Sequence, residues 1–377
     1  MIIRKVDIWR LHLPFLSPIK HNLATHTSSA NLVVKVTADT PRPGYGEGVP
    51  RDFVTGETIS ASLAFLVETL IPALLGQEFS SPPQLQTALR DLFLTTAGGR
   101  CPAAFCALET AVLDAAGRAW DLPLSEFFGT RRRGSLIYSA VIPMAPREQL
   151  ARLLGLVQTM AMPFVKLKVG GPDDLEVLKL ARETLGWQVD IRADANCAWT
   201  ATEAIRRLRE LAPYRLSAVE QPVAKDDLEG LQEVGAATGL PVIADESLCN
   251  ENDARRLIDL KACGIFNLRL SKCGGPGAAG RIRRLAAAAG VRCQLGCHVG
   301  ETSILSAAGR HFASCGPDLV YLEGSFSPFL FARELVAQPV VFGPGGLASD
   351  LTGPGLGIEV LDQALSDFAV SHQQLNA

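Results

Sequence analysis

The sequence predicts an α/β fold in which parallel strands and helices alternate and close into a (β/α)8-type, TIM-like barrel. Between residues 164 and 272, short apolar runs each end in one or two charged residues. Asp194, Glu220, Asp245 and Arg269 end four of these runs at intervals of 26, 25 and 24 residues, with an amphipathic stretch in each interval. Such a spacing is the length of one strand, one helix and two short loops. In a closed barrel the carboxyl ends of the strands meet on one face, so these charges are expected to converge there.

The length and composition favour two domains and exclude several kinds of partner. The chain has 377 residues, 47% of them hydrophobic, and a formal net charge of −3, so it can bury a large core but has no basic excess for nucleic acid. Its N-terminus shows no signal-peptide pattern, and no window offers the roughly 18 apolar residues of a membrane span. The nine cysteines form no CxxC pair. We therefore expect a cytoplasmic protein that has no nucleic-acid or membrane partner.

Residues 1–125 are expected to form an α+β capping domain. Apolar alternation predicts strands at 3–13, 32–37 and 45–47, and the apolar spacing turns helical from Thr58 to about Trp120. The polar stretch at 17–29 is predicted to be a long loop between the first two strands. Because polar loops of that length are usually either functional or disordered, Lys20 and Thr25 within it are candidate substrate-binding residues.

Residues 126–325 are expected to form the barrel, and residues 326–377 a segment that returns to the capping domain. The first barrel strand is placed at 137–143, and the eighth ends near 320–324. The final segment is rich in Gly and Pro, with FGPGG and LTGPGLG as examples. So many turn signals exclude another strand and helix of the barrel.

The charged strand ends predict a metal-dependent site. Asp194, Glu220 and Asp245 offer only oxygen ligands, which suit a hard cation such as Mg²⁺, with Mn²⁺ as an alternative. Lys166 and Lys168 share parity on one strand and so point inward together. Their mutual repulsion is expected to lower the pKa of at least one of them toward the range of a general base. Surface salt bridging is the competing interpretation, and the matched spacing and inward parity disfavour it.

Several motifs together resemble a known family. They are GYGEG at 44–48, KLK at 166–168, DAN at 194–196, EQP at 220–222, ADES at 244–247 and CGG at 273–275. In this order and spacing the chain resembles the mandelate racemase/muconate lactonizing enzyme family of the enolase superfamily and, within it, the muconate lactonizing subgroup. The resemblance implies an isomerase or lyase that takes the proton α to the carboxylate of a small substrate and forms a metal-stabilised enediolate. It also implies Lys168 as the base and Lys166 as its electrostatic partner, and a homo-oligomer is expected.

The remaining site residues surround these groups. Asn196 and Glu246 are expected to orient the metal ligands, and His298 and Glu323 to line the substrate pocket. Arg269 is a departure, because the subgroup carries a second lysine at this position. A guanidinium stays protonated, so Arg269 cannot act as a second base. Lys272, which has the opposite parity, is expected to lie outside the cavity.

With Lys168 as the only base, a muconate-type cycloisomerase or a syn-dehydratase is expected first, and Arg269 would contribute fixed positive charge. The alternative is a racemase or epimerase of N-acyl amino acids or dipeptides, in which another residue such as His298 replaces the second lysine. A barrel that binds a ligand without catalysing a reaction is disfavoured, because the carboxylates and lysines are intact.

Residues 275–280 also fit GxGxxG, which allows an NAD-dependent oxidoreductase. That motif lies late in the array, whereas a dinucleotide-binding half begins with it.

Overall fold

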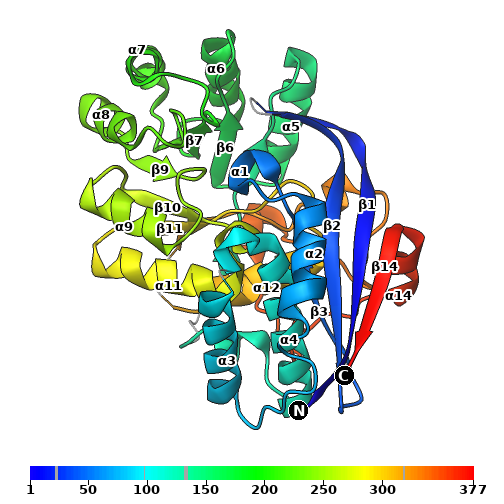
Figure 1. Cartoon of the computed structure of the whole chain (residues 1–377). Coiled ribbons are helices and arrows are strands. Elements are labelled where there is room, and N and C mark those ends of the chain that lie inside the picture. The colour runs from blue at the N-terminus through cyan, green and yellow to red at the C-terminus, as the bar shows by residue number, and fades with distance from the viewer. Residues whose placement is uncertain (22–23, 97, 131–134, 317–318) are drawn as a thin grey trace.

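The structure, a computed structural model, describes the chain except residues 22–23, 97, 131–134 and 317–318. The three consecutive arginines at 131–133 therefore lie outside the described residues. A four-stranded antiparallel sheet with its helices packs beside an eight-stranded parallel sheet with its helices (Figure 1). In the described part of the chain, no helix combines the length and the apolar character needed to cross a bilayer.

The antiparallel sheet forms the core of the capping domain. Its strand order is β14 (Ala369–Asn376), β1 (Ile3–His21), β2 (Ala24–Ala38) and β3 (Gly44–Gly48). The end of the chain thus returns to the capping domain as predicted, because β14 pairs with β1. Helix α4 (Pro102–Trp120) packs against β3, where a Cβ atom at Gly46 would lie 2.1 Å from the Ala107 carbonyl oxygen. The GYGEG motif therefore permits close contact between this helix and the sheet.

The prediction of a loop at 17–29 is wrong. Strands β1 and β2 continue through this stretch as a long hairpin, in which Ile19 pairs with His26 and Lys20 with Thr25. Near its tip, the Met144 N–H donates to the Lys20 carbonyl oxygen at 3.3 Å, which docks the hairpin on the barrel. Polar residues suit these strands because the ribbon extends beyond the sheet, where its outer face meets solvent.

The capping domain has several further helices and turns. They are α1 (Asp52–Thr55), α2 (Ile59–Phe65), the π-helix η1 (Leu66–Leu70) and α3 (Pro82–Thr95), with 3₁₀ turns η2 (Gly98–Arg100) and η3 (Leu124–Phe127). Helix α2 begins at the predicted change of periodicity, where the Thr58 hydroxyl accepts from the Ala61 N–H at 3.2 Å.

The parallel sheet forms the predicted barrel. Its strands follow one another in chain order: β5 (Ala140–Ile142), β6 (Phe164–Lys168), β7 (Asp190–Asp194), β8 (Val219–Glu220), β9 (Val242–Ala244), β10 (Ile265–Leu268), β11 (Arg292–Leu295) and β12 (Leu319–Leu322). The Ser139 N–H donates to the Leu322 carbonyl oxygen at 2.7 Å, so the two outer strands meet and the sheet closes. The first strand begins later than predicted, because β4 (Leu136–Ile137) pairs instead with β13 (Leu347–Ala348).

Helices surround the barrel. The longer ones are α5 (Arg147–Thr159), α6 (Asp174–Leu185), α7 (Ala201–Leu211), α8 (Leu228–Thr238), α9 (Glu251–Asp259), α11 (Gly275–Ala288) and α12 (Ser303–Ala313). Short helices and turns complete the described elements: η4 (Ala212–Tyr214), α10 (Leu270–Cys273), α13 (Ser327–Leu330), η5 (Pro344–Gly346) and α14 (Asp362–Asp367). Helix α9 starts with a capping box between Asn250 and Asp253.

Two buried glutamates of the capping domain cap helices of the barrel. Glu47 in β3 accepts from the N–H groups of Thr302 and Leu305, each at 3.0 Å, at the start of α12. Glu109 in α4 accepts from the Gly277 N–H at 3.0 Å at the start of α11. Carboxylates suit helix N-termini, where N–H groups lack helical partners. These contacts fix the capping domain on the barrel.

The glycine-rich motif at 275–280 serves this contact. A Cβ atom at Gly275 would lie 2.2 Å from one carboxylate oxygen of Glu109, so only glycine lets α4 approach. A dinucleotide would need its phosphate at the same helix start. The Glu109 carboxylate already occupies that position, which removes the structural basis for the NAD-dependent interpretation.

Glu109 predicts a measurable pH dependence of stability. Burial raises its pKa from 4.5 to about 7, so the folded state holds its proton more tightly than the unfolded state does. The stability that Glu109 contributes below its unfolded pKa is therefore lost as pH rises through about 7. Between pH 4.5 and pH 8, the free energy of unfolding should decrease in both proteins. In Glu109→Gln, which keeps an acceptor for Gly277, the decrease should be about 3 kcal/mol smaller than in the wild-type protein. Urea titrations across this range measure the difference, and parallel pH profiles for the two proteins would contradict it.

Candidate active site

The register of the barrel strands brings the predicted charges to one end of the sheet. Lys168 pairs with Asp194, and Asp194 pairs with Glu220 on the next strand. Asp245 directly follows β9 and Arg269 directly follows β10. Because strands β6 to β10 all run in parallel, their carboxyl ends lie together, as the spacing predicted.

Lys166 lies at the centre of the charged groups and is 2% exposed. Its Nζ is 3.2 Å from Asp194 Oδ2, 3.1 Å from Glu220 Oε1 and 2.8 Å from Glu323 Oε2. Burial alone would lower its pKa, but Glu220, Glu323 and Asp194 together outweigh burial and raise it. The expected lowering of at least one lysine pKa therefore does not apply to Lys166, because three carboxylates surround it. Lys166 is a fixed cation of the site.

Lys168 is held at the cavity wall. Its Nζ donates to Asp194 Oδ2 and to Asn196 Oδ1, each at 2.6 Å. The Asn196 amide in turn donates to Glu246 Oε1 at 3.0 Å, so Asn196 orients Lys168 and links it to Glu246. Burial opposes ionisation of Asp194, but Lys168 and Lys166 hold the pKa of its carboxyl below the ordinary value. Lys168 therefore faces the cavity beside a carboxylate that stays ionised.

Glu220 is fully buried and accepts from two amides that the sequence analysis missed. Asn267 donates to Oε1 at 2.8 Å and Gln294 donates to Oε2 at 2.9 Å. Asn267 lies in β10 and Gln294 in β11, and only inward parity along these strands could have singled them out. Burial raises the pKa of Glu220 to about 8.

Asp245 is held by two cations. The Arg269 guanidinium contacts Oδ2, and Lys272 Nζ lies 2.7 Å from Oδ1. Although burial favours the neutral acid, Arg269 and Lys272 lower the pKa of Asp245. Lys272 is not among the described residues that line the cavity, in agreement with the prediction. Its contact with Asp245 was missed, because Lys272 belongs to helix α10 and strand parity does not apply there.

The three carboxylates are chemically suited to a hard divalent cation. Asp194, Glu220 and Asp245 are fully buried at adjacent strand ends and offer only oxygen. Glu246 Oε2 is also buried, and no hydrogen-bond partner for it lies within the described residues. In the same residues, no three acidic, histidine or cysteine side chains are already arranged around one cation position. Lysine and arginine nitrogens compensate these carboxylates here, so cation binding requires the ion pairs to adjust.

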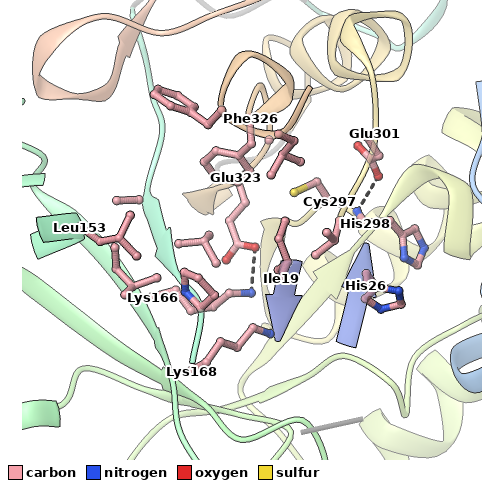
Figure 2. A pocket seen from close by; sticks show the side chains of 18 of the residues that line it. Ile19, His26, Leu153, Lys166, Lys168, Cys297, His298, Glu301, Glu323 and Phe326 are labelled. Atoms are coloured by element: carbon pink, nitrogen blue, oxygen red, sulfur yellow. Dashed lines mark hydrogen bonds and ion pairs between the residues drawn. The ribbon is translucent and has the colours of Figure 1, made fainter. Parts of the chain in front are cut away.

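A cavity of about 270 Å³ lies beside Lys166 and Lys168 (Figure 2). Figure 2 shows Leu153 and Phe326 on one side of it and His26 on the other. The apolar residues that line the cavity include Leu153, Leu156, Met160, Phe326, Phe329 and Phe342. The ends of the barrel strands thus bear the charged groups, whereas a helix and the chain beyond β12 provide an apolar wall.

His298 lies on the same side of the cavity as His26, away from the two lysines (Figure 2). Its backbone N–H donates to Glu301 Oε1 at 2.7 Å. Burial, together with the charges of Arg269 and Arg51, lowers the pKa of His298 well below its ordinary value, so its ring is neutral. Burial raises the pKa of Glu301 to about 8. The sequence analysis did not single out Glu301 as a site residue, because a glutamate after a glycine turn has no distinctive pattern.

Two predicted residues of the hairpin differ in their placement. Lys20 lines the cavity and is exposed to solvent. Thr25 is exposed and is not among the described lining residues, so its prediction as a substrate contact is wrong. Ile19 and His26 pair across the hairpin, and both line the cavity.

Known proteins resemble this chain over almost its whole length. N-succinyl-L-Arg/Lys racemase of Bacillus cereus is 29% identical over 98% of both chains, and its crystal structure superposes with a TM-score of 0.92 over 100% of both. Muconate cycloisomerase 1 of Rhodococcus opacus is 29% identical over 94% of this chain and 95% of its own. The dipeptide epimerase of Enterococcus faecalis V583, complexed with Mg and L-Leu-L-Tyr, is 28% identical, with a TM-score of 0.86 over 95% of this chain and 100% of that one.

Family models match both parts of the chain. Residues 4–129 match the N-terminal domain of mandelate racemase and muconate lactonizing enzyme, and residues 149–364 match the enolase C-terminal domain-like model. The barrel, the capping domain and the order of the charged strand ends agree with both matches. The chain therefore belongs to the mandelate racemase/muconate lactonizing enzyme family of the enolase superfamily.

Proposed function

We propose that the protein is a divalent-metal-dependent racemase or epimerase that removes the proton α to the carboxylate of an N-acyl amino acid or a dipeptide. The observation that carries this proposal is the position of Lys168. Its amine lies at the cavity wall, held by Asp194 and oriented by Asn196, so a substrate carbon in the cavity can deliver a proton to it.

Mg²⁺ is the proposed cofactor, with Mn²⁺ as an alternative. Asp194, Glu220 and Asp245 would hold the ion, and the related dipeptide epimerase was crystallised with Mg. When bound, the ion supplies concentrated positive charge where the substrate carboxylate gains negative charge. Lys166, whose pKa is raised, adds a fixed positive charge next to it.

The relatives reverse the order of reactions that the sequence predicted. The sequence analysis placed a cycloisomerase or syn-dehydratase first because Arg269 replaces a second lysine. N-succinyl-Arg/Lys racemase and dipeptide epimerases favour the racemase or epimerase reading instead. A cycloisomerase remains the second candidate, favoured by the contact of Arg269 with Asp245, since a guanidinium bound there neither accepts nor donates a proton at neutral pH.

An epimerase must also deliver a proton to the face opposite Lys168. Arg269 is unsuited to this step, so another group of the cavity wall would serve. His298 has a neutral ring that can accept a proton, and Glu301, with its pKa near 8, can hold one at neutral pH. Both lie apart from the lysines in Figure 2. We assign proton delivery to the second face of the substrate α-carbon to His298 and Glu301.

The test is to follow single enantiomers of N-acyl amino acids and dipeptides in D₂O with Mg²⁺. The proposal predicts that the opposite enantiomer accumulates and carries deuterium at the α-carbon. NMR measures the deuterium, and chiral chromatography measures the enantiomers. Deuterium exchange with complete retention of configuration would contradict epimerisation and support the one-base cycloisomerase or dehydratase chemistry.

Replacement of the base gives a second prediction. In Lys168→Ala the rate of α-proton exchange should fall by about 10²–10⁴-fold, because a positioned general base accounts for that range. Lys179→Ala, at an exposed position of α6, is the matched control and should exchange at the wild-type rate. If Lys168→Ala exchanged the proton as fast as this control, the base would have to be another group.

A further inference from the structure

The cavity also restricts the acyl group of the substrate, an inference that rests on the proposed function. We propose that the substrate carries on its α-nitrogen an apolar or aromatic acyl group without an ammonium, so that N-acyl amino acids are preferred over dipeptides with a free N-terminus. Two features carry this proposal. The carboxylate of Glu323 in the cavity wall is already in contact with buried cations, and the wall opposite His26 is apolar.

Glu323 is the carboxylate at the end of β12, and both of its oxygens contact cations. Oε2 is 2.8 Å from Lys166 Nζ, and Oε1 accepts from the Arg192 guanidinium. Arg192 is fully buried in β7 and stacks on Tyr321, with 4.2 Å between the guanidinium carbon and the ring centroid. A substrate ammonium would have to share these oxygens with two buried cations, whose charge opposes its approach. Arg192 is therefore a positioning residue that compensates Glu323 and weakens its attraction for a charged amine.

The other lining carboxylates differ in their partners. Glu246 Oε1 accepts from Asn196, and Glu246 Oε2 is buried with no hydrogen-bond partner among the described residues. Glu301 accepts from the His298 backbone, and burial favours its neutral form. Arg51, Lys166 and Arg269 also line the cavity and are cations, so an added ammonium would meet like charge there.

The opposite wall suits an apolar group. Phe342 stacks on Tyr138 with 5.3 Å between ring centroids, and Phe326 meets Phe342 edge to face at 6.1 Å. These contacts hold the aromatic rings in place before substrate binds. Phe329 is 51% exposed and Leu156 is 45% exposed, so an acyl group placed here would remove apolar surface from water.

The closest test uses a matched pair of substrates, N-(3-phenylpropanoyl)-L-alanine and L-Phe-L-Ala. They share one skeleton, and the second differs only by an ammonium in place of a hydrogen atom. For α-proton exchange with Mg²⁺, we expect kcat/KM to be at least about tenfold higher for the acyl compound. N-acetyl-L-alanine, which lacks the ring, should also be at least about tenfold poorer than the phenylpropanoyl compound. Equal or faster exchange of the dipeptide, or equal exchange of the acetyl compound, would overturn the inference.

Measurements of substrate binding distinguish a failure of this inference from a failure of the proposed function. If none of the three compounds exchanged its proton, the proposed reaction would fail, and their Kd values from calorimetry with Mg²⁺ would still decide the selectivity. Tighter binding of the phenylpropanoyl compound supports the inference, and equal or tighter binding of the dipeptide overturns it.

Two variants locate the effect. Phe326→Ala should raise KM for the phenylpropanoyl compound about tenfold and leave kcat within about twofold, because the ring contributes binding and not chemistry. Leu94→Ala, at an exposed position of α3, is its control.

Arg192→Met should lower KM for the dipeptide relative to the acyl compound, whereas Arg192→Lys should restore the wild-type preference. Circular dichroism shows whether each variant is folded, and an unchanged preference in folded Arg192→Met would remove Arg192 from the account.

Discussion

The structure depends on the compensation of charges that are buried together at one end of the barrel. Four cations and four carboxylates meet there: Lys166, Lys168, Arg269 and Lys272 with Asp194, Glu220, Asp245 and Glu323. A buried ion without a partner costs several kcal/mol, so each charge requires the others. Lys166 is the central cation of this cluster, because it contacts three of the carboxylates. The same compensation lowers the pKa of Asp194 and of Asp245 and holds Lys168 in position at the cavity wall.

The capping domain is attached to this site by charge as well. Glu47 and Glu109 reach from β3 and α4 to the N-termini of α12 and α11, and the hairpin of β1 and β2 covers the cavity with Ile19 and His26. The residues after β11 that precede α12, among them His298 and Glu301, are thereby held between the two domains. Residues of the barrel surround the reacting end of the substrate, and residues at the contact between the two domains determine the shape of the remaining cavity.

The spacing of charged strand ends predicted the barrel and the gathering of its charges, since one strand and one helix have a nearly fixed length. Inward parity likewise predicted that Lys166 and Lys168 point to one place. Contacts that cross between strands were not predictable: Arg192 is an ordinary strand residue until β12 places Glu323 beside it, and Lys272 lies in a helix that interrupts the strand pattern. The hairpin at 17–29 was missed because its polar composition is the same for a loop and for an exposed ribbon. Glu47 and Glu109 find their helices only when the two domains are assembled.

Arg269 distinguishes this site from one with two lysine bases. Its guanidinium contacts Asp245 and lies 3.9 Å from Glu220 Oε1, so it belongs to the charge cluster as well as to the lining of the cavity. The second proton step, if the reaction is an epimerisation, is then separated from the cluster and assigned to the His298 and Glu301 side. The proposed metal site and the position of Arg269 are linked, because both involve Asp245.

A crystal structure with Mg²⁺ and a bound N-acyl amino acid tests this account most directly. The account predicts Mg²⁺ ligated by Asp194, Glu220 and Asp245, with the substrate α-carbon next to Lys168 Nζ and Arg269 still on Asp245. The acyl group should lie against Phe326 and Phe342. Mg²⁺ bound away from these three carboxylates, or an α-carbon out of reach of Lys168, would contradict it.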